Sequence, residues 1–414
     1  MTNIEIENRE KIISFDALYE SYLKCRVGVS WKPSVKSFIL NSEANLLRME
    51  NQLREGTWKN GKPKTILITY PKRREALSVS FKDRIYQRSI NDNVLYPAMA
   101  KTFIKENCAC QHGKGTDYAR TLLKNQIWRY YRNNSLEGYV FQFDISGYYL
   151  NMKHDKVLEM FAKQIDDMTL ERITEILNNQ YQGEKGYNPG SQMVQIAGIS
   201  YLNKPDHFIK EQTDIKDYIR FMDDGIMFHP SKEYLEWVWK MLEEMLKPLG
   251  LSFNPKKTHI QPISKPFTFL GFKYRITETG KVIMSVDSQN VKHERRKLKK
   301  MVRKVKRGEM TKSKVDECYA SWRNHASKGN SYKLICRMDK YYKNYGRSCK
   351  KMQYQKSNMS VGEQTDLQNA KALKEKVETQ NLLIQYLAEM SGVYIPTEES
   401  EVNTDVQDIE EVEE

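Results

Sequence analysis

Residues 218–228 read YIRFMDDGIMF, and this stretch decides how the rest of the chain is interpreted. Two apolar segments flank the adjacent acids Asp223 and Asp224, and Gly225 follows them. The pattern predicts a β-hairpin whose tip carries both carboxylates and whose backbone is relaxed by Gly225. Asp-Asp-Gly is also ordinary turn chemistry, so the hairpin alone does not identify a site.

A third aspartate lies far upstream, in the apolar segment YVFQFDI at residues 139–145. Period-two alternation separates the aromatic residues of this segment from Gln142 and Asp144. Asp144 is therefore predicted at the polar edge of a half-buried strand, with a solvated strand end as the alternative. Carboxylates crowded at a strand edge and a hairpin tip repel one another unless cations hold them. Mg²⁺, which takes oxygen ligands and keeps substrate phosphates in its shell, is the expected cation.

The charge of the chain indicates a polyanionic partner. Its 414 residues suffice for two or three domains, and they carry a net charge of +14 with a pI near 9.2. Residues 398–414 contain nine acids and no Lys or Arg, so the remaining chain carries +23. Mere solubility is the alternative explanation, but an excess this large is typical of a nucleic-acid footprint.

Cysteine spacing and hydropathy indicate the compartment. The six cysteines have no CxxC spacing, which argues against a zinc site or a disulfide framework. We recognise no signal peptide and no apolar run long enough to span a bilayer. A cytoplasmic protein with reduced thiols and no membrane partner is therefore expected.

Two motifs together resemble one known family. FDISGYY at residues 143–149 and FMDD at residues 221–224 resemble the aspartate strand and the YxDD hairpin of reverse transcriptases, of the prokaryotic retron, diversity-generating retroelement or defence type. The resemblance extends over roughly residues 60–345. Phe221 replaces the usual tyrosine of the family, which removes a hydroxyl but no metal ligand. The resemblance implies an α+β right-hand polymerase fold with fingers, a palm of antiparallel sheet plus helices, and a helical thumb.

The same resemblance sets the expected domains. The N-terminal region and fingers are expected at residues 1–136, the palm at 137–284, the helical thumb at 285–349, a linker and C-terminal helix at 350–397, and an acidic disordered tail at 398–414. The first thumb segment, KHERRKLKKMVRKVKRG, is strongly basic. It would follow the phosphates of an RNA–DNA hybrid, although charge runs are usually solvated faces.

The resemblance also implies a catalytic centre. Its expected metal ligands, for two Mg²⁺ ions with Mn²⁺ as a substitute, are Asp144, Ile145, Asp223 and Asp224. The three aspartates and Lys257 are the expected catalytic residues. Lys257 resembles the polymerase lysine that protonates the leaving pyrophosphate, and a surface lysine in a basic protein is the alternative.

Four residues are expected to bind dNTP or template. Lys72 and Arg74 resemble the fingers residues that grip the triphosphate, where the fork of Arg meets phosphate oxygens bidentately; a solvated basic hairpin is the alternative. Tyr149 stands five residues after Asp144, where the family's aromatic residue excludes a 2′-hydroxyl, so DNA synthesis is expected. Without that neighbour, core packing of Tyr149 would be favoured.

Gln195 is the fourth, in the segment GSQMVQ at residues 190–195. The segment resembles the GxxxSQ motif of diversity-generating retroelement enzymes, except that Val194 replaces the serine. Gln195 touches the template or dNTP, or it only packs the helix. That helix is predicted to begin with Pro189 and Gly190 and to run to about residue 210.

The expected function is RNA-directed DNA synthesis, which makes cDNA from an RNA template. The departure at Val194 and the extra C-terminal region favour an antiphage defence system with a dedicated structured non-coding RNA. The alternatives are the mutagenic enzyme of a diversity-generating retroelement, untemplated DNA synthesis, and a non-catalytic RNA-binding scaffold. Expected partners are the RNA template, the cDNA product, dNTPs, and an accessory protein or a second copy of the chain.

Overall fold

The computed structural model describes residues 2–69, 73–188 and 190–356. Contacts divide the described chain into two units: residues 2–291 with 325–331, and residues 292–324 with 332–356. Throughout these described ranges, every helix is too short or too polar to cross a membrane. The mixture of helices and antiparallel sheets confirms the expected α+β class.

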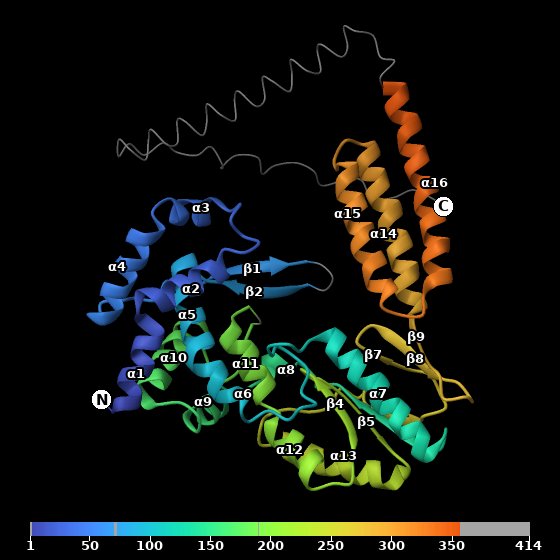
Figure 1. Cartoon of the computed structure of the whole chain (residues 1–414), viewed down its shortest axis with the longest axis horizontal. Coiled ribbons are helices and arrows are strands. Elements are labelled where there is room, and N and C mark those ends of the chain that lie inside the picture. The colour runs from blue at the N-terminus through green and yellow to red at the C-terminus, as the bar shows by residue number, and fades with distance from the viewer. Residues whose placement is uncertain (1, 70–72, 189, 357–414) are drawn as a thin grey trace, which may run out of the picture. The chain divides into compact units, whose positions relative to one another are not determined.

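The first unit begins with helices and a β-hairpin whose first strand is mostly exposed. Ser14 and Ser80 cap two of these helices, because each side chain accepts a hydrogen bond from a backbone N–H in the first turn. Lys64–Ile68 and Arg74–Ser78 form an antiparallel hairpin (Figure 1). The elements are α1 (Asn3–Ile13), α2 (Phe15–Cys25), α3 (Pro33–Leu40), α4 (Ser42–Arg54), β1 (Lys64–Ile68), β2 (Arg74–Ser78), α5 (Phe81–Ile90), the π-helix η1 (Asn91–Leu95), α6 (Tyr96–Ala100) and α7 (Thr116–Asn134).

A four-stranded antiparallel sheet forms the centre of this unit, in the order β4-β5-β3-β6. The apolar segment at residues 139–145 supplies β3, and the segment at residues 218–228 supplies β4 and most of β5, so both form strands as predicted; β5 pairs directly with β3. The elements are β3 (Tyr139–Phe143), α8 (Tyr148–Asn151), α9 (His154–Ala162), α10 (Asp167–Gln180), α11 (Gln192–Ser200), α12 (Asn203–Glu211), β4 (Asp217–Phe221), β5 (Asp224–His229), α13 (Lys232–Leu246) and β6 (His259–Pro262).

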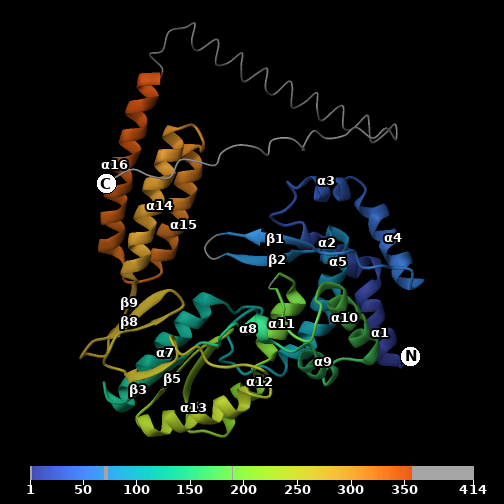
Figure 2. The same cartoon turned by 180° about the vertical axis from the view of Figure 1, so that it is seen from behind.

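Helices cover both faces of the central sheet. Trp239 of α13 stacks on Phe141 of β3, with ring centroids 5.1 Å apart. Tyr130 of α7 packs against Phe228 of β5. The register pairs Phe228 with Val140, the neighbour of Phe141, so the two aromatic contacts lie on opposite faces. Figure 2 shows the sheet with α7 and α13 from behind.

This coverage corrects the expected environment of Asp144. β3 was predicted to be half-buried, with Asp144 at a polar edge. In the structure β3 pairs with a strand on each side, and Asp144 is only 5% exposed. The prediction was wrong because alternation in one strand cannot show which distant segments pack against its polar residues; here Thr268 contacts Gln142, and Asn254 contacts Asp144.

The helix predicted from Pro189 to about residue 210 is also corrected. Two helices, α11 and α12, replace it, and the chain turns at Tyr201 and Leu202. Pro205 lies in the first turn of α12 and has no N–H to donate to the carbonyl of Tyr201. A continuous helix would therefore lose a backbone hydrogen bond at this point.

A small three-stranded sheet completes the first unit. It has the order β7-β8-β9 and includes β7 (Phe267–Phe269), β8 (Phe272–Ile276) and β9 (Val282–Val286). Leu270 and Gly271 both have positive φ, as a type I′ hairpin turn requires. β7 and β8 therefore form a tight antiparallel hairpin.

The second unit consists of helices, mainly from α14 (Ser288–Lys306), α15 (Lys312–Ser327) and α16 (Tyr332–Lys356). Leu298 and Val302, four positions apart on α14, are buried, and Tyr319 stacks on Tyr342. α16 continues past residue 349 to Lys356. The predicted C-terminal helix and acidic tail lie outside the described residues.

Candidate active site

The β4–β5 hairpin carries Asp223 and Asp224 on a very tight turn. Phe221 pairs with Asp224, so only Met222 and Asp223 form the loop between the strands. Met222 has a φ of +59°, the backbone conformation at the first position of a type II′ turn. A non-glycine residue seldom adopts this conformation, so the turn needs support from its surroundings.

Gly225 does not relax this turn, contrary to the prediction. It lies within β5, where it pairs with Phe143 of β3. A Cβ atom on Gly225 would overlap with the aromatic ring of Phe143. Glycine is required at this position because the ring packs over the neighbouring strand.

The register of β3 and β5 brings the distant aspartates together. Phe143 pairs with Gly225 in antiparallel register, so the next residue on β3, Asp144, lies beside Asp224. Both aspartates line a cavity of about 530 Å³, together with Lys257 and residues of the β7–β8 hairpin. Residues far apart in sequence thus present their carboxyl groups to one space.

A short segment after β5 and α13 holds Asp144 in place. The side-chain amide of Asn254 donates to Oδ1 of Asp144 at 2.9 Å, and Nζ of Lys257 donates to Oδ2 at 2.6 Å. The backbone N–H of Asn254 donates to the carbonyl of Asp144, while Thr258 Oγ1 accepts from the N–H of Asp144. Asp144 therefore has a fixed orientation.

The carboxyl groups perturb one another. Burial, the charge of Asp223 and a hydrogen bond with Asp144 raise the pKa of Asp224 to about 7. Burial and the charge of Asp144 also raise the pKa of Asp223. The hydrogen bond to Asp144 raises the pKa of Lys257, because the ammonium form is the one that binds a carboxylate. Neighbouring negative charges are thus only partly compensated by one lysine.

These donors suit a hard divalent cation. Carboxylate oxygens are the preferred ligands of Mg²⁺, and a cation between Asp144, Asp223 and Asp224 would relieve the repulsion that raises two of their pKa values. In the described parts of the chain, no three His, Cys, Asp or Glu side chains already have the arrangement of a metal cage. Lys257 instead compensates the charge of Asp144 directly.

Ile145 was expected to supply a backbone carbonyl to the metal. It forms an isolated antiparallel bridge with Phe253, made by Ser146 N–H to Ser252 O and by Asn254 N–H to Asp144 O. Neither hydrogen bond of this bridge uses the Ile145 carbonyl. The side chain of Ile145 is buried in the core.

Tyr149 lies between α11 and the turn that bears Asp223. Its hydroxyl is 3.9 Å from Sδ of Met222. A Cβ atom on Gly198 of α11 would lie 2.8 Å from the same hydroxyl, so glycine leaves the room that this ring occupies. Burial is the main cause that raises the pKa of the Tyr149 phenol, and the charge of Asp223 adds to it. The ring is therefore held beside the carboxylates.

The structure shows no contact between the three aspartates and the other described residues that were predicted to bind substrate. Gln195 is partly exposed on α11, one helical turn before Gly198. Arg74 begins β2, and Lys72 lies outside the described residues. No described contact joins Gln195 to the three aspartates.

Sequence reasoning missed several residues around the site. Asn254 and Thr258 hold Asp144, and Gly198 makes room for Tyr149. Arg220 is the largest side chain with complete burial, and it binds Asp206. A lone arginine within the apolar strand YIRF was a visible signal, because an unpaired charge cannot stay in such a strand.

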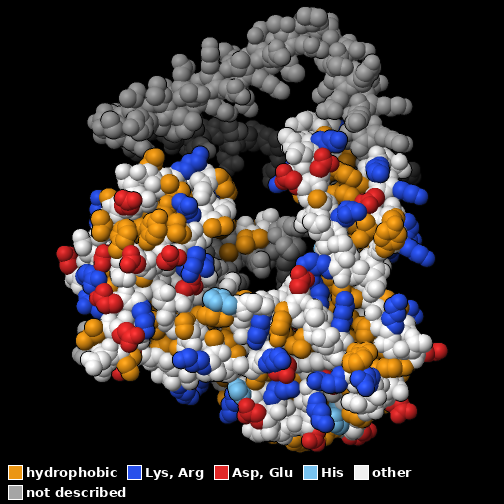
Figure 3. All heavy atoms as spheres, in the orientation of Figure 1, with side chains coloured by type: hydrophobic (Ala, Val, Ile, Leu, Met, Phe, Trp, Pro, Cys, Tyr) orange, Lys and Arg blue, Asp and Glu red, His pale blue; other side chains and the backbone are white. Residues whose placement is uncertain are grey.

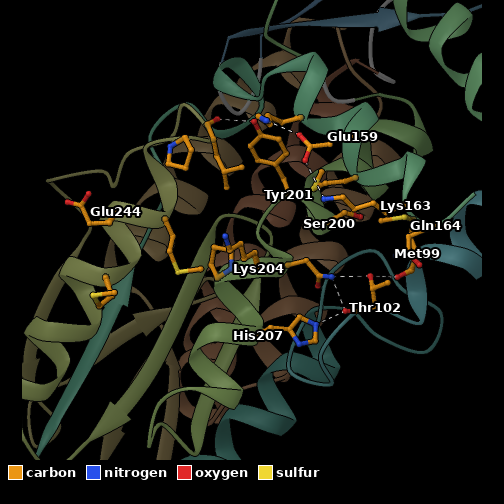
Figure 4. Close-up of a pocket in the computed structure, with 18 residues that line it drawn as sticks. Met99, Thr102, Glu159, Lys163, Gln164, Ser200, Tyr201, Lys204, His207 and Glu244 are labelled. Atoms are coloured by element: carbon orange, nitrogen blue, oxygen red, sulfur yellow. Dashed lines mark hydrogen bonds and ion pairs between the residues drawn. The ribbon is translucent and has the colours of Figure 1, made fainter.

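A separate apolar cavity of about 650 Å³ lies elsewhere in the first unit (Figure 4). Methionines contribute much of its lining, including Met99, Met160, Met241 and Met245. His207, at its edge, hydrogen bonds with the carbonyl of Thr102 at 2.9 Å. None of the predicted site residues lines this cavity.

The second unit has a basic surface of its own. Five residues of α14 and Arg307, which follows it, line an open hollow of about 720 Å³; the five are Arg296, Lys299, Lys300, Arg303 and Lys306. Figure 3 shows Lys and Arg side chains (blue) on the visible face of this helical unit. Clustered side chains of this kind bind phosphate backbones.

The chain is similar to one family of known proteins and to several solved structures. Residues 70–274 match the family model described as reverse transcriptase (RNA-dependent DNA polymerase). No curated protein matches the chain. Solved structures similar to it include telomerase from Candida albicans in complex with a TWJ fragment of telomeric RNA (12% identity, TM-score 0.41) and apo telomerase from Candida tropicalis truncated from its C-terminal domain (16% identity, TM-score 0.41). Each match covers 55% of this chain, and 45% and 55% of the respective telomerase chain, so the chain spans about half their length.

Proposed function

We propose that this chain, whose residues 70–274 match the reverse transcriptase family model, is an RNA-directed DNA polymerase, and that Asp144, Asp223 and Asp224 are its catalytic carboxylates. The observation that carries this proposal is the β3–β5 register, which sets Asp144 beside Asp224. In this proposal the central sheet is the palm, the β1–β2 hairpin belongs to the fingers, and α14–α16 form the thumb of a right-hand polymerase.

The three aspartates and the Ile145 carbonyl would hold two Mg²⁺ ions, or Mn²⁺ in their place. When bound, the metal ions would activate the primer 3′-hydroxyl and stabilise the leaving pyrophosphate. Asn254 and Thr258 fix Asp144, so its carboxylate needs little reorganisation before it binds a cation.

Lys257 has a second role in this proposal. Its contact with Asp144 keeps it protonated, since the pKa of its ammonium group is raised. Released from Asp144, it carries a proton that it can donate to the pyrophosphate oxygen. General-acid assistance of this kind is typically worth about 10²–10⁴-fold in rate.

Tyr149 would select deoxynucleotides. Its ring is confined by Gly198 and Met222 beside the carboxylates, and there it would leave no room for a 2′-hydroxyl. Lys72 and Arg74 would bind the triphosphate from the fingers, and Gln195 would contact the template or the dNTP. The basic hollow on α14 would follow the backbone of the template–primer duplex.

The biological setting is a further part of the proposal. We favour a cytoplasmic antiphage defence system of prokaryotic type, in which the enzyme copies a dedicated non-coding RNA, with an accessory protein or a second copy of the chain as partner. Val194 supports this setting over a diversity-generating retroelement, since it replaces the serine of the GxxxSQ motif.

Primer extension tests the function. Purified protein is given an RNA or a DNA template, or none, with dNTPs or NTPs and Mg²⁺. Extension that requires the RNA template and dNTPs is the expected result. Extension without a template would indicate untemplated synthesis, and equal activity of the Asp223→Ala, Asp224→Ala double variant would indicate a scaffold without catalysis. Sequencing of the nucleic acid that copurifies with the protein identifies the RNA.

A further inference from the structure

A completely buried ion pair lies directly behind the turn that carries Asp223. Arg220 of β4 and Asp206 of α12 both have 0% exposed side chains. Nε of Arg220 lies 2.8 and 2.9 Å from the two carboxylate oxygens of Asp206, and Nη2 lies 2.7 Å from Oδ2. Tyr218 donates its hydroxyl hydrogen to the same carboxylate at 2.8 Å.

Other N–H groups of the guanidinium donate hydrogen bonds to backbone carbonyls. Nη2 donates to the carbonyl of Ile199 on α11 at 2.7 Å. Nη1 donates to the carbonyl of Met222 at 2.8 Å. Met222 is the turn residue with a φ of +59°, and its neighbour is Asp223. One planar group therefore links α12, α11 and the strained turn.

The backbone of Arg220 is held as well. Its N–H donates to the carbonyl of Glu106, and its carbonyl accepts from the N–H of Cys108. The free edge of β4 is thus paired by the segment around Asn107, and Arg220 cannot shift along the strand. The backbone that carries the Arg220 side chain is therefore held in place.

Stability alone does not explain an arginine here. Burying two charges costs free energy, and an apolar replacement of such a pair is often neutral or stabilising. A hydrogen bond to a residue in an unfavourable backbone conformation has a different consequence, because it selects one conformation of the turn.

We propose that Arg220, anchored on Asp206, is a positioning residue that holds the Met222–Asp223 turn in the conformation that presents the carboxylates of Asp223 and Asp224 to the cation site. The inference rests on the proposed function of these aspartates. Arg220 touches neither substrate nor metal in this scheme and acts only through the turn.

The test uses a variant that removes the whole polar cluster. In the full chain, Arg220→Met, Asp206→Leu and Tyr218→Phe together leave no buried charge or hydroxyl unpaired, so the variant is expected to keep a Tm near that of the parent. The carbonyl of Met222 then has lost its donor. We expect about 10–100-fold weaker Mn²⁺ binding, measured by electron paramagnetic resonance, and a lower kcat with unchanged affinity for template–primer.

Two further variants make the outcome decisive. Asp217→Asn breaks the ion pair with Arg129 at the other end of β4, and it should leave Mn²⁺ affinity and kcat unchanged. Arg220→Lys keeps the buried charge but replaces the guanidinium fork by a single ammonium group, so it should also weaken Mn²⁺ binding. This variant replaces the triple variant in the test if the triple variant does not fold. A folded triple variant or Arg220→Lys variant with the Mn²⁺ affinity of the parent would overturn the proposal. Because Mn²⁺ affinity is measured without nucleotide, this result stands even if the parent fails to extend any primer, which would count against the proposed function alone.

Discussion

Two clusters of buried charge lie on either side of the same turn, and they are compensated in opposite ways. Behind the turn, Asp206 raises the pKa of Arg220 against the effect of burial, and every contact satisfies both charges. In front of it, Asp144, Asp223 and Asp224 share one lysine. The first cluster is complete within the protein, whereas in the proposed function a cation completes the second. Under the proposed function, the first cluster supports the fold and the second performs the chemistry.

The largest expected effect is on catalysis by the incomplete cluster. Asp224→Asn removes a metal ligand and should reduce dNTP incorporation on an RNA template by about 10³-fold or more, equivalent to several kcal/mol. The same change relieves repulsion, so the Tm of the metal-free protein should rise. Incorporation within about threefold of the parent would remove Asp224 from the catalytic group.

The complete cluster should respond with the opposite sign in stability. Asp206→Asn leaves the Arg220 charge buried without its counter-charge, which should destabilise the protein by about 3–5 kcal/mol. Urea unfolding of the parent and of both Asn variants measures this contrast. If Asp206→Asn and Asp224→Asn shifted stability in the same direction, the distinction between the clusters would be lost.

The pH dependence of stability sharpens the comparison. The folded-state pKa of Asp224 is raised to about 7, above the ordinary value, so the folded protein holds a proton that the unfolded chain has released. Stability of the metal-free protein should therefore fall as pH rises from about 4 to about 7, by about 2–4 kcal/mol. Thermal melts of the Asp224→Asn variant over the same range provide the control, and they should lack this contribution. A parent whose stability rose across that window would contradict the raised pKa.

Lys257 has two roles at the incomplete cluster, as the partner of Asp144 and as the proposed proton donor. Lys257→Met removes both the proton donor and the cation that competes for Asp144. Incorporation should fall by about 10²-fold or more, while Mn²⁺ should bind more tightly than to the parent. Single-turnover kinetics and Mn²⁺ titration separate these effects. Weaker Mn²⁺ binding in the variant would show that Lys257 does not compete with the cation.

The smallest expected effect concerns nucleotide choice. Tyr149→Ala should admit ribonucleotides, and Gly198→Ala should push the Tyr149 ring away from α11 and reduce dNTP use by about tenfold, since the space beside Gly198 is filled. In the double variant the added methyl group has no ring to displace, so the effect of Gly198→Ala should vanish. Incorporation of dNTP and NTP by all four proteins forms a complete double-mutant cycle, and additive effects would contradict the assigned contact.

Local pattern predicted much of this centre. The strands around Asp144 and Asp223 follow from periodicity and turn chemistry. The location of the turn at Met222 does not follow from local pattern, because a positive φ at methionine depends on a hydrogen bond from Arg220. That bond requires an anchor on α12, which no local pattern predicts.

Burial was underestimated for the same reason. β3 looked half-exposed because Gln142 and Asp144 alternate with aromatic residues, yet helices cover both faces of the sheet. Asn254 and Thr258 reach Asp144 from more than a hundred positions along the chain. Such contacts are set by tertiary packing, whereas the aspartates themselves were identified by their motifs.

Equilibrium Mn²⁺ binding tests the three-carboxylate site most directly. Electron paramagnetic resonance titrations of the parent, Asp144→Asn and Asp224→Asn proteins are compared at one pH above 7, where the carboxyl groups are ionised. A shared cation site predicts that either substitution weakens Mn²⁺ binding at least about tenfold. Parent-like Mn²⁺ affinity in both variants would contradict the site and, with it, the catalytic assignment of all three aspartates.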